Sequence, residues 1–187
     1  MFITEIKKAT LMGALFGILG VAHATVTFGL ASNTDDAARR PELPAGCEFL
    51  AVDEGYVVIA HAYAVGVQIY RWNGTSWAFY GPEANLYASK NYRGHIGSHY
   101  VGPVWESNSG SLVSGTGAVP CAVDAKSVPW LKLSVSSSTG PGIFEGVTFI
   151  QRINTQGGVR PDAPGTTVGE EARVPYTAEY YFYKAQE

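Results

Sequence analysis

Residues 57–80 read VVIAHAYAVGVQIYRWNGTSWAFY and decide the fold of this chain. Apolar side chains recur at every second position from Val57 to Trp72, which is the period of a β-strand. Asn73-Gly74 then joins this run to a second one. Because both central residues of a type I′ turn need a positive φ, this dipeptide is a strong hairpin signal. The stretch predicts a long strand, with a bulge at Gly66, that turns into an antiparallel partner.

The same two-residue period returns along the rest of the chain, between turns that contain glycine or proline. Further strands are predicted at residues 84–89, 112–115, 128–135, 146–155 and 174–183. The Ser-, Gly- and Pro-rich segments 136–142 and 161–169 are typical of loops, and no long segment shows a helical period. We therefore expect an all-β fold, a single antiparallel β-sandwich or flattened barrel of about eight strands.

The N-terminus has the three parts of a secretory signal peptide in the usual order. Lys7 and Lys8 form a positive region, residues 11–21 are apolar but too short to span a bilayer, and Ala22-His-Ala24 is a small-x-small cleavage site. A membrane-anchoring helix is the alternative. We expect a signal peptide, an irregular polar arm and a single all-β domain, at residues 1–24, 25–46 and 47–187. The mature protein is then secreted or periplasmic and has no transmembrane segment.

The net charge limits the classes of partner that the protein can bind. The 187 residues carry 13 Lys and Arg against 16 Asp and Glu, a net charge of −3. This argues against nucleic acid as a partner, because nucleic acid is bound through a basic face.

In an oxidising compartment Cys47 and Cys121 are expected to form a disulfide, which would close a loop of about 75 residues and stabilise the fold by about 4 kcal/mol. Two buried free thiols are the alternative, and the wide spacing does not fit a cysteine-based zinc site.

A second informative stretch contains His99-Tyr100, a Gly-Pro turn and Trp105-Glu106. A carboxyl group beside an aromatic ring is partly desolvated, which raises its pKa, so His99 and Glu106 are candidates for a general acid–base pair. Alternatively, His99 bonds a backbone carbonyl or Glu106 and orders the loop.

Metal binding has weak support. In a strand, the side chains of His95 and His99 would lie about 13 Å apart, so only a turn could bring both to one ion. His61 falls in an apolar row and is expected to be a satisfied core or rim histidine. We predict no cofactor and no metal.

Two polar residues lie inside the strongest predicted strand. Gln151 and Arg152 have opposite parity, so one of them must face an apolar neighbourhood, where an amide or guanidinium is costly unless it is paired. Glu106 is a possible partner for Arg152. The pair could staple two sheets together or contact a ligand.

Several phrases, taken in order, resemble the DUF3455 family of exported bacterial and fungal proteins. They are Gly66-Val-Gln-Ile-Tyr70, Pro82-Glu-Ala-x-Leu86, His99-Tyr-x-Gly-Pro-x-Trp-Glu106, Val128-Pro-Trp-Leu131, Gly146-Val-Thr-Phe-Ile-Gln-Arg-Ile-Asn-Thr-x-Gly-Gly158 and Val174-Pro-Tyr-Thr-Ala-x-Tyr180. The resemblance covers about residues 43–183 and implies a secreted all-β domain without an established activity.

The sequence also departs from that family. Some fungal members carry a dehydrogenase label, which finds no support here because no Gly-x-Gly-x-x-Gly follows a strand and opens a helix. Family members often have cysteines where this chain has Arg71-Trp72 and Arg160-Pro161, so a disulfide of that kind is absent.

These observations favour a non-catalytic extracytoplasmic binding or surface module for an unknown small molecule or polysaccharide. The four Trp and eleven Tyr residues suit such ligands, although aromatic rings in sheets more often pair across strands. The candidate ligand-binding residues are His99, Tyr100, Trp105, Glu106, Gln151 and Arg152. A small hydrolytic or metal-assisted enzyme using His99 and Glu106 is the first alternative, and a structural envelope protein is the second.

Overall fold

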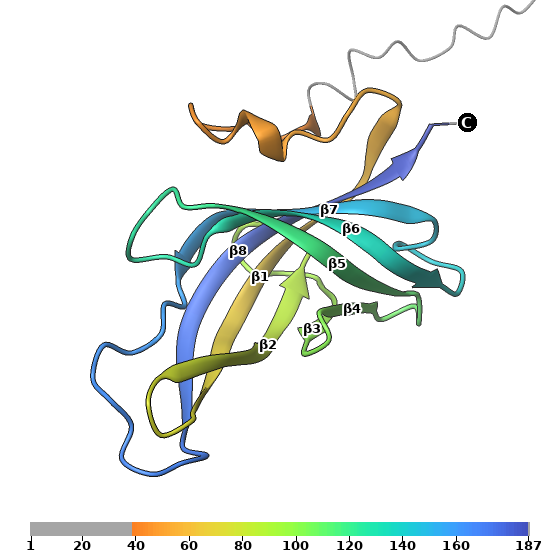
Figure 1. Cartoon of the computed structure of the whole chain (residues 1–187). Helices are drawn as coiled ribbons and strands as arrows, with labels where there is room; N and C mark the ends of the chain where they lie inside the picture. The colour runs from red at the N-terminus through yellow and green to blue at the C-terminus, as the bar shows by residue number, and fades with distance from the viewer. Residues whose placement is uncertain (1–38, 187) are drawn as a thin grey trace, which may run out of the picture. The chain divides into compact units, whose positions relative to one another are not determined.

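Eight antiparallel strands form the domain in the computed structural model, which describes residues 39–186 (Figure 1). Each strand pairs with the next one in the sequence, and the last pairs with the first, so the sheet closes into a barrel. The all-β prediction of about eight strands is confirmed. The strands are β1 (Tyr56–Trp72), β2 (Trp77–Tyr87), β3 (His95–Tyr100), β4 (Val104–Ser107), β5 (Leu112–Cys121), β6 (Trp130–Thr139), β7 (Val147–Gly157) and β8 (Glu171–Ala185).

The expected signal peptide and residues 25–38 of the expected arm lie outside the described residues. In the part of the chain that the structure describes, no helix combines the length and the apolar character needed to cross a membrane.

The hairpin predicted at Asn73-Gly74 joins β1 to β2, but its loop is longer than two residues. Trp72 pairs with Trp77, and the side-chain oxygen of Asn73 accepts hydrogen bonds from the backbone of Thr75 and Ser76 at 2.9 and 2.8 Å. The asparagine therefore closes a four-residue loop through its side chain, and Gly74 alone needs the positive φ of +97°.

The predicted bulge at Gly66 is displaced. The register between β1 and β2 shifts between Ile69 and Tyr70. Gly66 has a different role, since a Cβ atom there would lie 2.1 Å from the carbonyl oxygen of Glu83 on β2. Only glycine allows the two strands to approach this closely.

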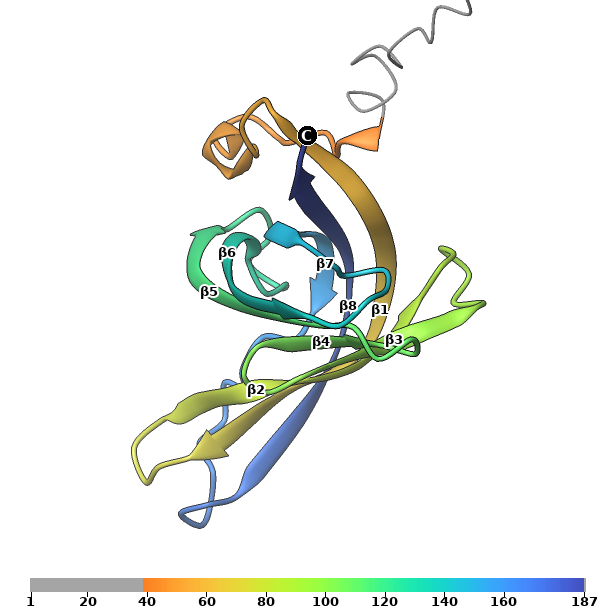
Figure 2. The same cartoon turned by 90° about the vertical axis from the view of Figure 1, so that its right-hand side faces the viewer.

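Side chains fill the barrel interior. Small residues of β1 and β2, such as Ala62, Ala64 and Ala84, leave room for the rings of Trp105, Tyr180 and Phe182, all of them buried. β1 and β8, the two longest strands, run side by side through both views and form one wall (Figure 2). Burying large aromatic rings supplies most of the hydrophobic stabilisation of such a core.

A segment that precedes β1 covers part of the outer surface. Its 3₁₀-helix η1 (Glu48–Leu50) packs Leu50 against Trp130 and Ile153 on the outside of the barrel. Lys132 of β6 donates hydrogen bonds at 2.8 Å to the carbonyl oxygens of Phe49 and Ala51. We call residues 39–55 the N-terminal segment.

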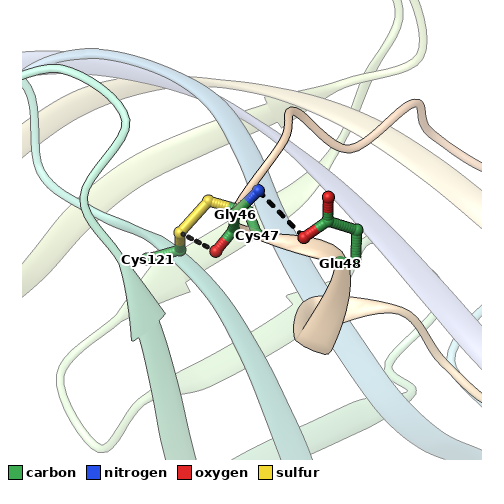
Figure 3. Close-up of a disulfide and its surroundings, with 4 residues drawn as sticks. All are labelled: Gly46, Cys47, Glu48 and Cys121. Atoms are coloured by element: carbon green, nitrogen blue, oxygen red, sulfur yellow. Dashed lines mark hydrogen bonds between the residues drawn. A yellow bond between two sulfur atoms is a disulfide. The ribbon is translucent and has the colours of Figure 1, made fainter.

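The predicted disulfide is present. Cys47 of the N-terminal segment is bonded to Cys121 at the end of β5, with Cα atoms 5.8 Å apart (Figure 3). Beside it, the backbone N–H of Gly46 donates to the carboxylate of Glu48 at 2.9 Å. The bond fixes the N-terminal segment to the barrel at the point where η1 begins.

Candidate functional site

The strands β3 and β4 separate the residues of the predicted acid–base pair. His99 stands directly opposite Trp105, and both side chains point into the barrel, with exposures of 2 % and 1 %. Tyr100 and Glu106 lie on the outer face, where the tyrosine hydroxyl donates to the Glu106 carboxylate at 2.8 Å. The structure therefore does not bring His99 and Glu106 together, because the alternation of a strand puts them on opposite sides of the sheet.

His99 has an interior environment. Its Nδ1 atom donates to the carbonyl oxygen of Val104 at 2.8 Å, and its ring stacks on Trp105. Burial lowers the pKa of His99 to about 3, with a further contribution from the charge of Arg152. The ring is neutral at physiological pH and faces other side chains, which favours the loop-ordering role over a role in catalysis.

Gln151 and Arg152 are both buried, on opposite faces of β7. The Arg152 guanidinium donates to the carbonyl oxygen of Pro129 from Nε at 3.2 Å and from Nη2 at 2.8 Å. Gln151 faces the N-terminal segment, where its Nε2 donates to the carbonyl oxygen of Leu50 at 2.6 Å and its Oε1 accepts from the Tyr183 hydroxyl. Glu106 lies on the outer face, so it does not serve as the partner of Arg152 that we considered.

His95 is exposed at the start of β3, with its ring edge against Tyr87 and its Nδ1 3.3 Å from the side-chain nitrogen of Asn108. Within residues 39–186, no three His, Cys, Asp or Glu side chains are grouped as the ligands of a metal ion would be.

A hollow of about 460 Å³ lies elsewhere, on the outside of the barrel over β7 and β8. We call it the first hollow. Strand residues supply most of its lining, and two loops add charged and aromatic groups. Its lining includes Tyr63, Trp130, Asn154, Gln156, Thr177 and Glu179 from the strands, and Lys90, Tyr92, Val123 and Asp124 from the loops.

Glu179 is held in place at the edge of this hollow. One carboxylate oxygen lies 2.8 Å from Nε2 of His61, and the other accepts from the side-chain nitrogen of Asn154 at 3.0 Å. His61 in turn stacks on Tyr181, with ring centroids 4.0 Å apart. Burial lowers the pKa of His61, and the hydrogen bond to Glu179 opposes this shift. His61 is thus the satisfied rim histidine that its sequence position indicates.

Backbone strain is concentrated in the same place. Among the described residues, two non-glycine residues have positive φ, Tyr92 at +56° and Asn154 at +49°, and both line the first hollow. Asn154 lies in the irregularity between Ile153 and Gln156 where β7 loses register with β8. A left-handed conformation costs a bulky residue such as Tyr92 about 1–2 kcal/mol and costs asparagine less, and such strain gathers at sites of function. Bulges of this kind redirect side chains.

A second hollow of about 410 Å³ adjoins the first. Pro41, Glu42, Leu43 and Pro44 of the N-terminal segment form one wall, and Ile153 and Tyr181 belong to the barrel side. Trp130 and Asn154 line both hollows, so the two spaces meet at these side chains.

Sequence reasoning did not select the first hollow. Its central contacts join residues far apart in the chain, since His61 and Glu179 are 118 positions apart. The available signal was Asn154, a polar residue before Gly157-Gly158 in an otherwise regular strand, which is typical of a bulge.

Comparison with known proteins agrees with the resemblance seen in the sequence. The model of the family described as "Protein of unknown function (DUF3455)" matches residues 53–184. No curated protein and no solved structure matches the chain.

Proposed function

The chain belongs to the DUF3455 family, and from the geometry of its site we propose that it is an extracytoplasmic, non-catalytic binding module that holds a saccharide in the first hollow. The observation that carries this proposal is the convergence of a pinned carboxylate, Glu179, and two strained residues, Tyr92 and Asn154, on one hollow.

The lining suits a ligand with many hydroxyl groups. Glu179, Asn154 and Gln156 present planar groups that accept or donate two hydrogen bonds each, which matches neighbouring hydroxyls on a sugar ring. Tyr63 and Tyr92 add amphipathic rings that can cover the apolar face of a sugar. A few fixed polar groups among aromatic walls are the usual composition of a ligand pocket.

Glu179 is prepared for this role. His61 and Asn154 each occupy one lone pair of the carboxylate, so its orientation is set before a ligand arrives. The Tyr181 hydroxyl is a further hydrogen-bond partner of Glu179, so of about four lone pairs the carboxylate keeps one for a ligand hydroxyl. A hydrogen bond to a charged group contributes about 1.5–3 kcal/mol.

Other observations favour binding over the two alternatives. The enzyme hypothesis depends on His99 and Glu106, which lie on opposite faces of the sheet. An envelope protein without a ligand site would have no use for backbone strain gathered at one hollow. The signal-peptide pattern of residues 1–24 and the Cys47–Cys121 disulfide support a location outside the cytoplasm.

The test is calorimetric titration of the purified protein with a panel of neutral mono- and oligosaccharides. Glu179→Gln should weaken binding about 10- to 100-fold, because one charged acceptor is lost while the side-chain volume stays the same. Glu106→Gln is the matched control, since this carboxylate is exposed, bonds Tyr100 and does not line the hollow. Binding of no saccharide, or equal losses in both variants, would reject the proposal.

A further inference from the structure

We propose that the site takes a linear oligosaccharide of at least two rings, which occupies both hollows and passes over Trp130 and Asn154. The second hollow then acts as a separate subsite that exists only while the N-terminal segment is held to the barrel. This inference rests on the proposed function, because it extends the same site.

The two hollows are similar in size and share a boundary. They measure about 460 and 410 Å³. Each lies in the lower part of the roughly 300–1,000 Å³ range of ligand pockets. Since Trp130 and Asn154 line both, an oligosaccharide that leaves one hollow at these side chains reaches the other directly.

The boundary offers a contact for a chain that crosses it. Asn154 uses its side-chain nitrogen to hold Glu179. Its side-chain oxygen accepts no hydrogen bond from any residue between 39 and 186, and Asn154 is exposed. A carbonyl oxygen that is fixed in direction and still has its lone pairs suits a sugar hydroxyl next to the glycosidic linkage.

The N-terminal wall of the second hollow has restricted backbone freedom. Pro41 and Pro44 fix φ at two of the four wall positions, which limits the conformational entropy that ligand binding would cost. The backbone N–H of Cys47 donates to the carbonyl oxygen of Pro44 at 3.0 Å. This turn leads directly into the disulfide.

The disulfide is therefore the covalent anchor of the second subsite, beside the hydrogen bonds of Lys132 and Gln151 to the same segment. Cys47 is three residues from Pro44 and is bonded to Cys121, which ends β5. The first hollow has no lining residue from the N-terminal segment. Release of the segment should remove the second subsite and leave the first in place.

The experiment compares ligand lengths. Wild type is titrated with two series, N-acetylglucosamine with its β-1,4-linked dimer and tetramer, and glucose with cellobiose and cellotetraose. In the series that binds, we expect the dissociation constant to fall at least tenfold from the single sugar to the tetramer. The Cys47→Ser/Cys121→Ser double variant should bind the single sugar as wild type does and lose this gain.

A second pair of variants keeps the test independent of the disulfide. Leu43→Ser alters the wall of the second hollow alone and should reduce the gain with length. Val123→Ser alters the first hollow alone and should weaken all lengths equally. Binding without length dependence, or a gain that survives both Leu43→Ser and loss of the disulfide, overturns this inference and leaves the proposed function standing. Absence of binding at every length in both series overturns this inference, and absence of binding across the whole saccharide panel overturns the proposed function as well.

Discussion

The imidazole of His99 lies face to face with the indole of Trp105, with ring centroids 4.1 Å apart and planes inclined by 7°. Tyr180 meets both rings with its edge, at centroid distances of 5.2 and 5.4 Å. The three side chains occupy the middle of the barrel. A proton on His99 would therefore place a positive charge where water cannot solvate it, which costs free energy. His99 behaves as an aromatic core residue that carries one hydrogen bond.

We expect acid to destabilise the protein through His99. Its pKa is about 3 in the fold against 6.5 for an ordinary histidine, so between these values the unfolded chain binds a proton that the folded one does not. Stability is then fully present above about pH 6.5 and falls toward lower pH by at most about 1.4 kcal/mol per unit. Urea unfolding of wild type and His99→Phe at pH 7.5 and 5.0 measures this, and the variant should show the smaller difference.

His95→Asn is the control for this series, because His95 is exposed and belongs to the same strand. Its pH dependence should equal that of wild type. An equally steep dependence in His99→Phe would mean that other groups carry the effect. His61 is one such group, since burial also lowers its pKa.

A second prediction concerns the buried pair Gln151 and Tyr183. Gln151→Leu should lower the free energy of unfolding by about 2–4 kcal/mol, because the Leu50 carbonyl loses its donor and the Tyr183 hydroxyl loses this acceptor. Adding Tyr183→Phe should cost less in this background than in wild type. Urea unfolding of the two single variants and the double variant gives the coupling energy. Additive effects would mean that the two side chains do not depend on each other.

The same residue illustrates what the sequence can and cannot reveal. The two-residue period predicted β1 and β5 to β8, but it divided β2 at Gly81-Pro82 and missed β3 and β4. The opposite parity of Gln151 and Arg152 predicted at least one buried polar group. Both are buried because both faces of β7 are covered, one by the interior and the other by the N-terminal segment. The return of that segment across the barrel has no local signal, because it depends on packing and on the disulfide.

Long-range strand pairing also explains why the sequence did not predict the first hollow. The contact between His61 and Glu179 forms because β8 pairs with β1 and closes the sheet. Periodicity identifies strands without giving their neighbours. For His99 and Glu106, the register decided the outcome. Pairing His99 with Trp105 turns Glu106 outward, and a shift of one residue would have reversed it.

Loss of the disulfide should destabilise the fold as well as alter the second hollow. The bond joins residues 74 positions apart, so its removal should lower the free energy of unfolding by about 4 kcal/mol in the chain-entropy model. Urea unfolding with and without dithiothreitol measures the effect. The Cys47→Ser/Cys121→Ser variant should match the reduced protein and ignore the reductant. If wild type unfolded without reductant reacts with two equivalents of a thiol reagent, the bond does not form.

Asn154 allows backbone strain and binding to be separated at one position. Glycine adopts positive φ without a steric cost, whereas alanine keeps the strain, so Asn154→Gly should be about 1 kcal/mol more stable than Asn154→Ala. Both variants lack the amide that holds Glu179, and both should therefore lose saccharide affinity to the same extent. Thermal unfolding measures the stability, and calorimetry with a saccharide that wild type binds measures the affinity.

Asn85→Ala is the control, because Asn85 is an exposed asparagine of β2 outside the hollows. It should change neither the stability nor the affinity. If the left-handed residue serves binding, Asn154→Gly is less strained than wild type and yet binds the saccharide more weakly. Equal stabilities for the glycine and alanine variants would show that the positive φ at position 154 causes no strain. Unchanged affinity would show that Asn154 does not take part in binding.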